Sequence, residues 1–408
     1  MTQPNGKLAT IQYQLTIGLC LLLTAAGCVG APDADFGVVS DQPAFEFRDV
    51  GSVQQALVGG VWGFVLVAPD GTHKNGYSSR AAVPFSDNSV YTERLTTGHY
   101  GILFDSIGGD GGHAQVVVDG WTSSNRCALS GFIASGAHEY VEVNCTTFDG
   151  TPVDNAVWVQ YVRGPGNNVG LAAYVALGAK LSVGVRHTPP ANLSYNSRGG
   201  SNTITKKSTG VFSVDLPSMF ETGRSPMIQV STAGTTGEYC KILEDLRSGP
   251  NGYLVRVSCF NARGQAADAF FTLNTFVYSE VGINGGGAYG RALQANNTSW
   301  YGTMWSFDSR VEPCSSNEAV RARLVIPNPD LPGDPEVYYM EFGSMFHPGT
   351  VPHVTAQGAD NVYCSPMQRY SSGNTQRLST HCWTPAGTRA RSMYYASTAS
   401  YKAACPAL

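Results

Sequence analysis

Charged residues are scarce in this chain, and it contains no run of basic residues. Asp, Glu, Lys and Arg make up 14% of the 408 residues, whereas about 25% is usual for soluble domains. The formal net charge at pH 7 is -4. Proteins that bind DNA or RNA carry clustered Lys and Arg side chains that neutralise phosphates. The sequence therefore predicts no nucleic-acid partner.

A membrane-spanning apolar run is also missing. The stretch at residues 15–26 supplies roughly a dozen apolar positions, and a spanning helix needs about 20. This stretch follows a short polar start with Lys7 and precedes small residues before Cys28, which is the pattern of a cleaved signal peptide. We expect residues 1–27 to be a signal peptide and the exported chain to enter an oxidising compartment.

Motifs for catalysis or metal binding are absent from the sequence. No serine has glycine both two residues before and two residues after it, as a nucleophile elbow requires. The 8 histidines show no close metal-ligand spacing. Residues 285–290 satisfy G-x-G-x-x-G, but a strand-like segment follows them where a dinucleotide site needs a helix. The sequence predicts no catalytic residue, no metal and no cofactor.

Glycine, proline and aromatic residues are abundant. The 47 Gly and 22 Pro residues favour frequent turns. The hydrophobic content of 42%, with 20 Tyr, 17 Phe and 6 Trp, is sufficient to fill several cores. Short apolar segments between frequent turns are typical of strands. We expect an all-β chain.

Cysteine spacing indicates an internal repeat. Cys20 lies in the signal segment and Cys28 at its end, which leaves eight cysteines. Six of them form three pairs with separations of 18, 19 and 18 residues. The pairs are Cys127 and Cys145, Cys240 and Cys259, and Cys364 and Cys382. Three similar pairs predict three similar units.

The segments around these pairs agree with one another. Alternating apolar runs place Tyr100, Phe212 and Tyr338 at one position, and the segments QVVVDG, QVSTAG and HVTAQG place Val116, Val230 and Val354 at another. Alternation with a period of two predicts half-buried strands. We define repeat 1 as residues 59–163, repeat 2 as 169–279 and repeat 3 as 286–403. Residues 28–58 form a tether, and repeat 3 carries an insertion with Cys314 and a C-terminal extension with Cys405.

The repeat resembles one found in secreted proteins of soil bacteria. Its pattern is an aromatic strand, G-x-[YF]-x-V-x-[FL], [QH]-V-x-x-x-G, Y-C, and V-x-V-x-C-F followed by glycine. Repeat 2 matches best, and the resemblance covers residues 59–403. The resemblance implies export and repetition, and it implies no activity.

We expect three tandem antiparallel β-sandwich-like repeats of seven or eight strands each, because a repeat of this length suits one such sandwich. The alternative is a single β-propeller with two blades per repeat, although the two halves of a repeat do not resemble each other as blades usually do. We predict one disulfide within each repeat between the cysteines paired above. By elimination, Cys314 and Cys405 form a fourth.

Cys28 is left without a partner beside the cleavage site. The segment LTAAGC resembles a bacterial lipobox, in which the cysteine receives lipid and becomes the mature N-terminus. An ordinary signal peptidase is the alternative, because Ala25 and Gly27 also suit it. We predict a lipid-anchored protein of the cell envelope, attached to the membrane by lipid alone, with a freely secreted protein as the alternative.

Two kinds of side chain suggest ligand sites. Asp154 and Asp268 each lie nine residues after the second cysteine of their repeats, but we interpret them as carboxylates that orient a turn before the last strand of the repeat. Aromatic residues such as Trp158 suit stacking on sugars, but in an alternating strand they usually pack in a core.

The leading functional hypothesis is a non-enzymatic surface protein whose repeats act as binding or structural modules for a cell-surface, cell-wall or polysaccharide ligand. The alternative is an extracellular hydrolase with a site built from loops. An enzyme should gather unpaired carboxylates and histidines in one cleft of one repeat, whereas a binding array should show a similar feature in each repeat.

Overall fold

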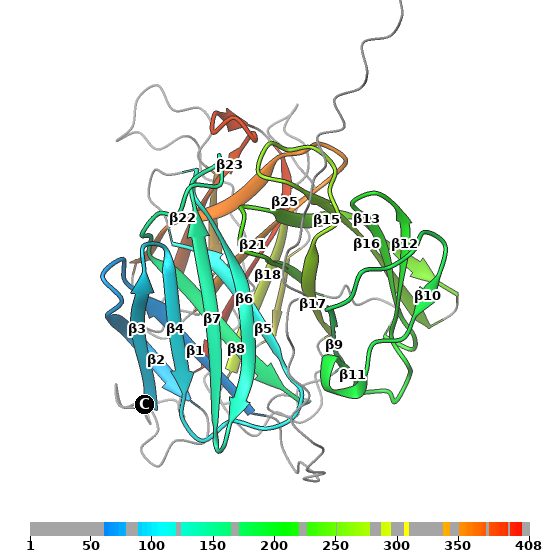
Figure 1. The fold of residues 1–408 in the computed structure, drawn as a ribbon, viewed down its shortest axis with the longest axis horizontal. Helices are drawn as coiled ribbons and strands as arrows, with labels where there is room; N and C mark the ends of the chain where they lie inside the picture. Colours follow the sequence, from blue (N-terminus) through cyan, green and yellow to red (C-terminus); the bar gives the residue numbers. More distant parts are fainter. Residues whose placement is uncertain are drawn as a thin grey trace, which may run out of the picture. The chain divides into compact units, whose positions relative to one another are not determined.

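The computed structural model describes part of the chain, and Figure 1 shows its ribbon. The described residues are 61–78, 89–119, 124–164, 171–219, 227–249, 251–277, 287–294, 306–309, 338–342, 351–372, 375–390 and 392–401. The signal segment, the tether with Cys28, and the predicted pair Cys314 and Cys405 lie outside these residues.

The described part of the chain is all-β, as the sequence predicts. Its regular elements are strands, apart from the 3-10 helix η2 (Ala191–Leu193). The strands form open sheets, and across the described ranges they form no closed propeller. Within these ranges no helix has the length and apolar character to cross a membrane.

Repeat 1 contributes two four-stranded arrays. Their strand orders are β2-β1-β8-β5 and β6-β7-β4-β3, and Figure 1 shows the second array with its strands side by side in cyan. The strands are β1 (Val61–Val67), β2 (His73–Ser78), β3 (Val90–Thr96), β4 (His99–Phe104), β5 (His113–Val118), β6 (Arg126–Ser135), β7 (His138–Thr146) and β8 (Val157–Arg163).

Repeat 2 contributes the arrays β11-β9-β17-β14 and β10-β12-β13-β16-β15. The strands are β9 (Leu171–Leu177), β10 (Arg186–His187), β11 (Ser194–Asn196), β12 (Thr203–Ser208), β13 (Val211–Leu216), β14 (Met227–Ala233), β15 (Tyr239–Ser248), β16 (Gly252–Phe260) and β17 (Phe270–Val277).

Repeat 3 contributes the arrays β21-β25-β18-β19 and β20-β23-β22, and β24 pairs with β23. The strands are β18 (Gly287–Gln294), β19 (Ser306–Ser309), β20 (Tyr338–Phe342), β21 (Val351–Gln357), β22 (Tyr363–Ser372), β23 (Thr375–Trp383), β24 (Arg389–Ala390) and β25 (Met393–Tyr401).

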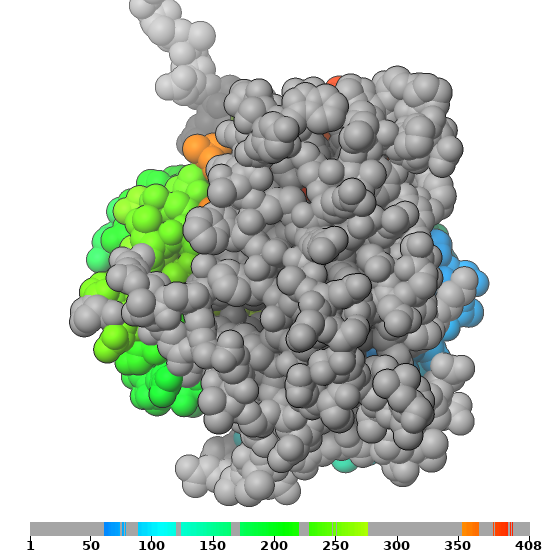
Figure 2. Space-filling model, turned by 180° about the vertical axis from the view of Figure 1, so that it is seen from behind, coloured from blue at the N-terminus to red at the C-terminus, as the bar shows by residue number. Residues whose placement is uncertain are grey.

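Two of the sheets cross from one repeat into the next. Strand β6 of repeat 1 pairs in parallel with β14 of repeat 2, where Leu129 is opposite Ala233. Strand β15 of repeat 2 pairs in parallel with β21 of repeat 3, where Ile242 is opposite Gln357. In Figure 2, green residues of repeat 2 adjoin orange residues of repeat 3 on the face shown. Strand β22 of repeat 3 also lies against β5 of repeat 1.

Alternation along the strands separates two buried faces. In β5, Val116 packs in the apolar core between the two arrays of repeat 1, together with Tyr100 and Val159. In β14, Val230 packs in the corresponding core of repeat 2 with Phe271. The residues on either side of these valines point to the opposite face, because side chains alternate along a strand. That second face is also buried, and it belongs to the contact between repeats.

The structure contains one disulfide in each repeat, between the two cysteines that were predicted to pair from their spacing in the sequence. Each joins neighbouring antiparallel strands, with the two Cα atoms 4.0 Å apart. The bonds are Cys127–Cys145 between β6 and β7, Cys240–Cys259 between β15 and β16, and Cys364–Cys382 between β22 and β23. The separation of 18 or 19 residues is therefore that of a hairpin closed by a bond near its open end.

Candidate functional site

The repeats are joined by the residues that immediately precede the first cysteine of each pair. Each of these side chains donates a hydrogen bond to the main-chain oxygen three residues before the first cysteine of another repeat. The bonds run from Arg126 Nη1 to Gly237 O at 3.1 Å, from Tyr239 Oη to Asn361 O, and from Tyr363 Oη to Ser124 O. The bonds thus pass from repeat 1 to 2, from 2 to 3, and from 3 back to 1. We call Arg126, Tyr239 and Tyr363 the junction ring.

The three side chains of the junction ring also contact one another. The guanidinium carbon of Arg126 lies 4.4 Å from the ring centroid of Tyr239 and 4.1 Å from that of Tyr363. The two tyrosine centroids are 5.3 Å apart. All three residues are buried, so the cation–π contacts act away from solvent, where they are strongest. Burial raises the pKa of both tyrosines, which therefore remain neutral hydrogen-bond donors at pH 7.

A second set of contacts follows the same cyclic order. Gly387, in the turn after β23, has φ of 75°, and a Cβ there would lie 2.8 Å from the Phe148 ring of repeat 1. Gly264 of repeat 2 would likewise meet Pro385 of repeat 3 at 2.1 Å. A residue with a side chain would be strained by the positive φ and would also collide with the neighbouring repeat. These turns therefore need glycine at the positions where the sequence repeats it.

The strands β5, β14 and β21, which we call the central strands, all contact one another. The main-chain N–H of Val116 donates to Ser231 Oγ at 2.9 Å, and that of Val230 donates to Thr355 Oγ1 at 3.3 Å. Ser231 and Thr355 occupy the same motif position in repeats 2 and 3. The residue at that position in repeat 1 is Val117. Because valine has no hydroxyl, the corresponding hydrogen bond from repeat 3 to repeat 1 cannot form.

Gln115 connects repeats 1 and 2 through a buried polar network. Its Oε1 accepts a hydrogen bond from Ser231 Oγ at 2.6 Å, and its Nε2 donates to the main-chain oxygen of Thr272 at 3.3 Å. The Thr272 hydroxyl in turn donates to Ala114 O at 2.8 Å. Removing one partner from such a network leaves a buried polar group unsatisfied, at a cost of about 1–3 kcal/mol.

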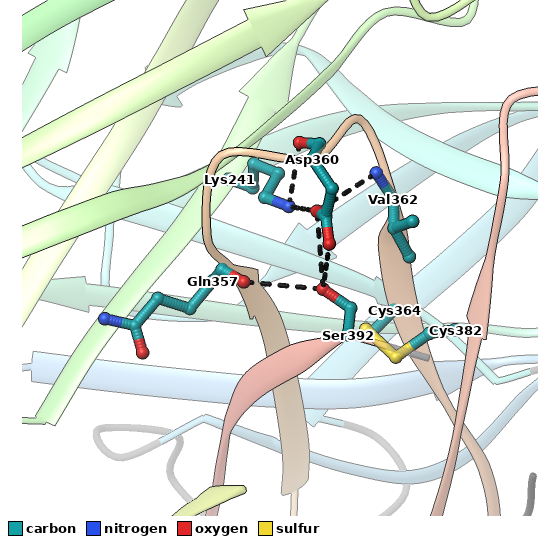
Figure 3. The surroundings of a disulfide bond; sticks show 7 residues. All are labelled: Lys241, Gln357, Asp360, Val362, Cys364, Cys382 and Ser392. Atoms are coloured by element: carbon teal, nitrogen blue, oxygen red, sulfur yellow. Dashed lines mark hydrogen bonds and ion pairs between the residues drawn. A yellow bond between two sulfur atoms is a disulfide. The ribbon is translucent and has the colours of Figure 1, made fainter. Parts of the chain in front are cut away.

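An ion pair joins repeats 2 and 3 beside the disulfide of repeat 3 (Figure 3). The side chain of Lys241 is 1% exposed and donates to the carboxylate of Asp360 and, at 3.1 Å, to its main-chain oxygen. Ser392 Oγ donates to Asp360 Oδ2 at 3.1 Å. Burial lowers the pKa of Lys241, and the contact with Asp360 opposes this change. Lys241 follows the first cysteine of repeat 2, whereas Ala128 and Ser365 occupy this position in repeats 1 and 3. This position therefore supplies an ion pair only to the contact between repeats 2 and 3.

The carboxylates considered as ligand sites hold turns, as interpreted, but the turns are those between β3 and β4 and between β12 and β13, not the turn before the last strand of the repeat. Asp154 Oδ1 accepts from the main-chain N–H of Gly98 at 2.8 Å, and Asp268 Oδ1 accepts from that of Gly210 at 2.9 Å. Arg94 pairs with Asp154 at 2.8 Å, and this contact lowers the carboxyl pKa. Trp158 is 2% exposed and is therefore part of a core, as predicted for a strand aromatic.

Histidine and acidic side chains of the described part of the chain lie in all three repeats. Within the ranges given above, no three His, Cys, Asp or Glu side chains are placed to hold a metal. The buried histidines belong to different repeats, with His113 in repeat 1 and His353 and His381 in repeat 3. Polar side chains instead meet where repeats contact one another, and their chemistry is that of hydrogen bonding between repeats.

Sequence reasoning missed the junction ring and the central strands as sites. The [QH]-V segment recurs in all three repeats, and Tyr precedes the first cysteine in repeats 2 and 3, where repeat 1 has Arg126. Recurrence shows that a position matters but does not show which part of the chain it contacts. No protein-family model, curated protein or solved structure matches this chain.

Proposed function

We propose that this chain is an exported, non-enzymatic protein whose three repeats close on one another to form a single preassembled binding or structural unit. The junction ring is the observation that carries this proposal. Its three equivalent hydrogen bonds return from repeat 3 to repeat 1, so each repeat has two neighbours and no repeat is terminal.

The paired arrays of strands support a β-sandwich-like structure for each repeat, over residues 59–163, 169–279 and 286–403. Each repeat has its own disulfide, and repeats 1 and 2 each enclose an apolar core. The repeats are then not independent modules on a string, because polar side chains such as Gln115 and Lys241 are committed to contacts between them. A ligand of such a unit would bind to its outer surface.

Export is the second part of the proposal. Three disulfides are typical of proteins that reside in an oxidising compartment. We propose that residues 1–27 are removed, that Cys28 carries lipid, and that residues 28–58 tether the unit to the cell envelope. Its ligand is then a cell-surface, cell-wall or polysaccharide component. A protein cut by an ordinary signal peptidase would be freely secreted.

Cleavage between repeats tests the closed unit. Protease sites are inserted at residues 165–168 and 280–285, and the oxidised protein is cut at both and passed through a size-exclusion column. We expect the three fragments to elute together at the volume of the uncut protein. Fragments that separate under native conditions would show independent repeats. Uncut protein with the same insertions is the control for damage by the insertions.

Replacement of Cys28 by Ser tests the anchor. We expect the wild-type protein to partition into detergent and to yield an N-terminal peptide with the added mass of lipid, and the Cys28→Ser variant to do neither. An unmodified Cys28 peptide from soluble wild-type protein would exclude the anchor. A pull-down with the mature protein against cell-wall, polysaccharide and surface-protein fractions then identifies the ligand class.

A further inference from the structure

Three buried polar side chains, one from each repeat, have ring or amide atoms without hydrogen-bond partners. They are His113 of repeat 1, Asn274 of repeat 2 and His353 of repeat 3, and all are at most 4% exposed. The atoms without partners are His113 Nδ1, His353 Nε2, and both Nδ2 and Oδ1 of Asn274. Buried polar atoms in folded proteins are nearly always paired with protein or with ordered solvent.

These three side chains lie around the same part of the central strands. Asn274 in β17 is the direct partner of Tyr174 in β9, so their side chains share one face. The ring of Tyr174 stacks on that of His113, with centroids 5.7 Å apart. His353 Nδ1 lies 3.4 Å from Thr355 Oγ1, which accepts from Val230 N in β14.

Strand β14 links the contact between His353 and Thr355 to the side chain of Asn274. The residue before Val230 is Gln229, which is opposite Asn274 in the pairing of β14 with β17. His353 is also close enough to His113 for a charge on one to oppose a charge on the other. The three repeats therefore contribute one side chain each to a common polar region.

Neighbouring groups determine the tautomer of His113. Gln115 Nε2 lies 3.3 Å from the main-chain oxygen of Thr272, which can only accept, so this atom is the amide nitrogen. The same nitrogen lies 2.7 Å from His113 Nε2 and donates to it. A neutral imidazole that accepts at Nε2 carries its proton on Nδ1. The free Nδ1 of His113 is therefore a donor.

For His353, the neighbouring hydroxyl allows both tautomers. Thr355 Oγ1 accepts from Val230 N and keeps a second lone pair and its own proton, so its contact with His353 Nδ1 fits either direction of hydrogen bonding. Nε2 of His353, the atom without a partner, is a donor where the hydroxyl donates to Nδ1 and an acceptor where it accepts from Nδ1. Asn274 Nδ2 adds a donor. Each repeat thus contributes a buried nitrogen without a hydrogen-bond partner.

We propose that His113, Asn274 and His353 form a buried site that binds one small hydrogen-bond acceptor, either a halide ion or a water molecule. A halide can accept from three donors at once, whereas a buried water makes about three hydrogen bonds in all and accepts at most two of them. Water would also donate to Asn274 Oδ1, which a halide cannot do. The site extends the proposed function, because its occupant would contact all three repeats.

Crystals of the oxidised protein grown in sodium bromide test the site directly. An anomalous peak within hydrogen-bond distance of the three nitrogens identifies a halide. Ordinary density of one oxygen atom there, without anomalous signal, identifies water. Either result supports the site, and the absence of both overturns it. This result does not depend on whether the protein is exported or anchored, so the two proposals can fail separately.

Replacement of Asn274 by Leu provides a test in solution. If the site is occupied, this change of similar volume removes contacts to the occupant, and the midpoint of thermal unfolding falls. If the site is empty, the change removes two unpaired polar atoms and the midpoint rises, which would refute the proposal. Asn144→Leu is the matched control, because Asn144 is partly exposed on β7, and we expect its midpoint to stay near that of the wild type.

Discussion

The phenol of Tyr363 in β22 donates a hydrogen bond to the main-chain oxygen of Ser124, which lies 239 residues earlier in the chain. This bond joins the last repeat to the first, whereas the other two bonds of the junction ring join repeats that follow one another in sequence. No peptide linker holds repeat 3 against repeat 1, so noncovalent contacts alone close the ring. We expect the loss of these contacts to lower the stability of all three repeats.

Replacement of Tyr363 by Phe removes this hydrogen bond and keeps the ring against Arg126. We expect the free energy of unfolding to fall by about 0.5–1.5 kcal/mol, the usual contribution of one such bond, as measured by urea denaturation. Tyr91, which is 56% exposed on β3, supplies the control, and Tyr91→Phe should change little. Equal stability of the Tyr363→Phe variant and the wild type would show that the bond does not close the ring.

Two substitutions of Arg126 separate hydrogen bonding from aromatic packing. Arg126→Leu leaves the main-chain oxygens of Gly237 and Ala262 without this donor, at a cost of about 1–3 kcal/mol each. Arg126→Tyr introduces the tyrosine that repeats 2 and 3 have at this position, and its hydroxyl keeps one hydrogen-bond donor. We expect stability in urea to decrease from wild type to Arg126→Tyr to Arg126→Leu. A Leu variant as stable as the wild type would contradict the role of Arg126.

The disulfide of repeat 2 should stabilise the whole unit. Replacing both Cys240 and Cys259 by Ala opens a loop with a separation of 19 residues, and the chain-entropy model predicts a loss of about 3 kcal/mol. Urea denaturation of the double variant measures the loss. Peptide mapping of the wild type without reduction checks the pairing, and linked peptides from different repeats would refute it.

Acid should destabilise the protein through its buried histidines. Burial lowers the pKa of His113 and of His353 from 6.5 to about 3. Between these pH values the unfolded chain binds protons that the folded chain does not, so stability is lost as the pH falls from about 6.5 towards 3. Each histidine contributes a loss of up to about 1.4 kcal/mol per pH unit.

The comparison of wild type with His353→Asn isolates this effect. Burial raises the pKa of Glu139, so this carboxyl acts in the opposite direction and obscures the pH dependence of the wild type alone. We expect unfolding free energies measured between pH 7 and pH 4 to fall less steeply in the variant. If the unfolding free energies of the two proteins changed equally with pH, protonation of His353 would not destabilise the folded protein.

The strands and hairpins could be predicted because their signals are local. The alternation in residues 99–104 and 211–216 predicts the strands that the structure contains as β4 and β13, since side-chain direction alternates along any extended segment. The turn that Asp154 holds could not be predicted in this way, because Gly98 lies 56 residues before Asp154 in the chain. The polar face of β5 was harder to interpret, because an alternating strand with Gln115 facing outward looks the same whether solvent or another repeat covers that face.

The sequence by itself determined the all-β class and the pairing of cysteines within each repeat, because both depend on residues that are near one another in the chain or on a pattern that recurs. The tertiary structure alone decided that the repeats share sheets and that the junction ring returns from repeat 3 to repeat 1. Such contacts join residues far apart in the chain, and the same tyrosine before a cysteine bonds to a different repeat in each case. The partner of each side chain is therefore set by how the sheets pack, which no local pattern specifies.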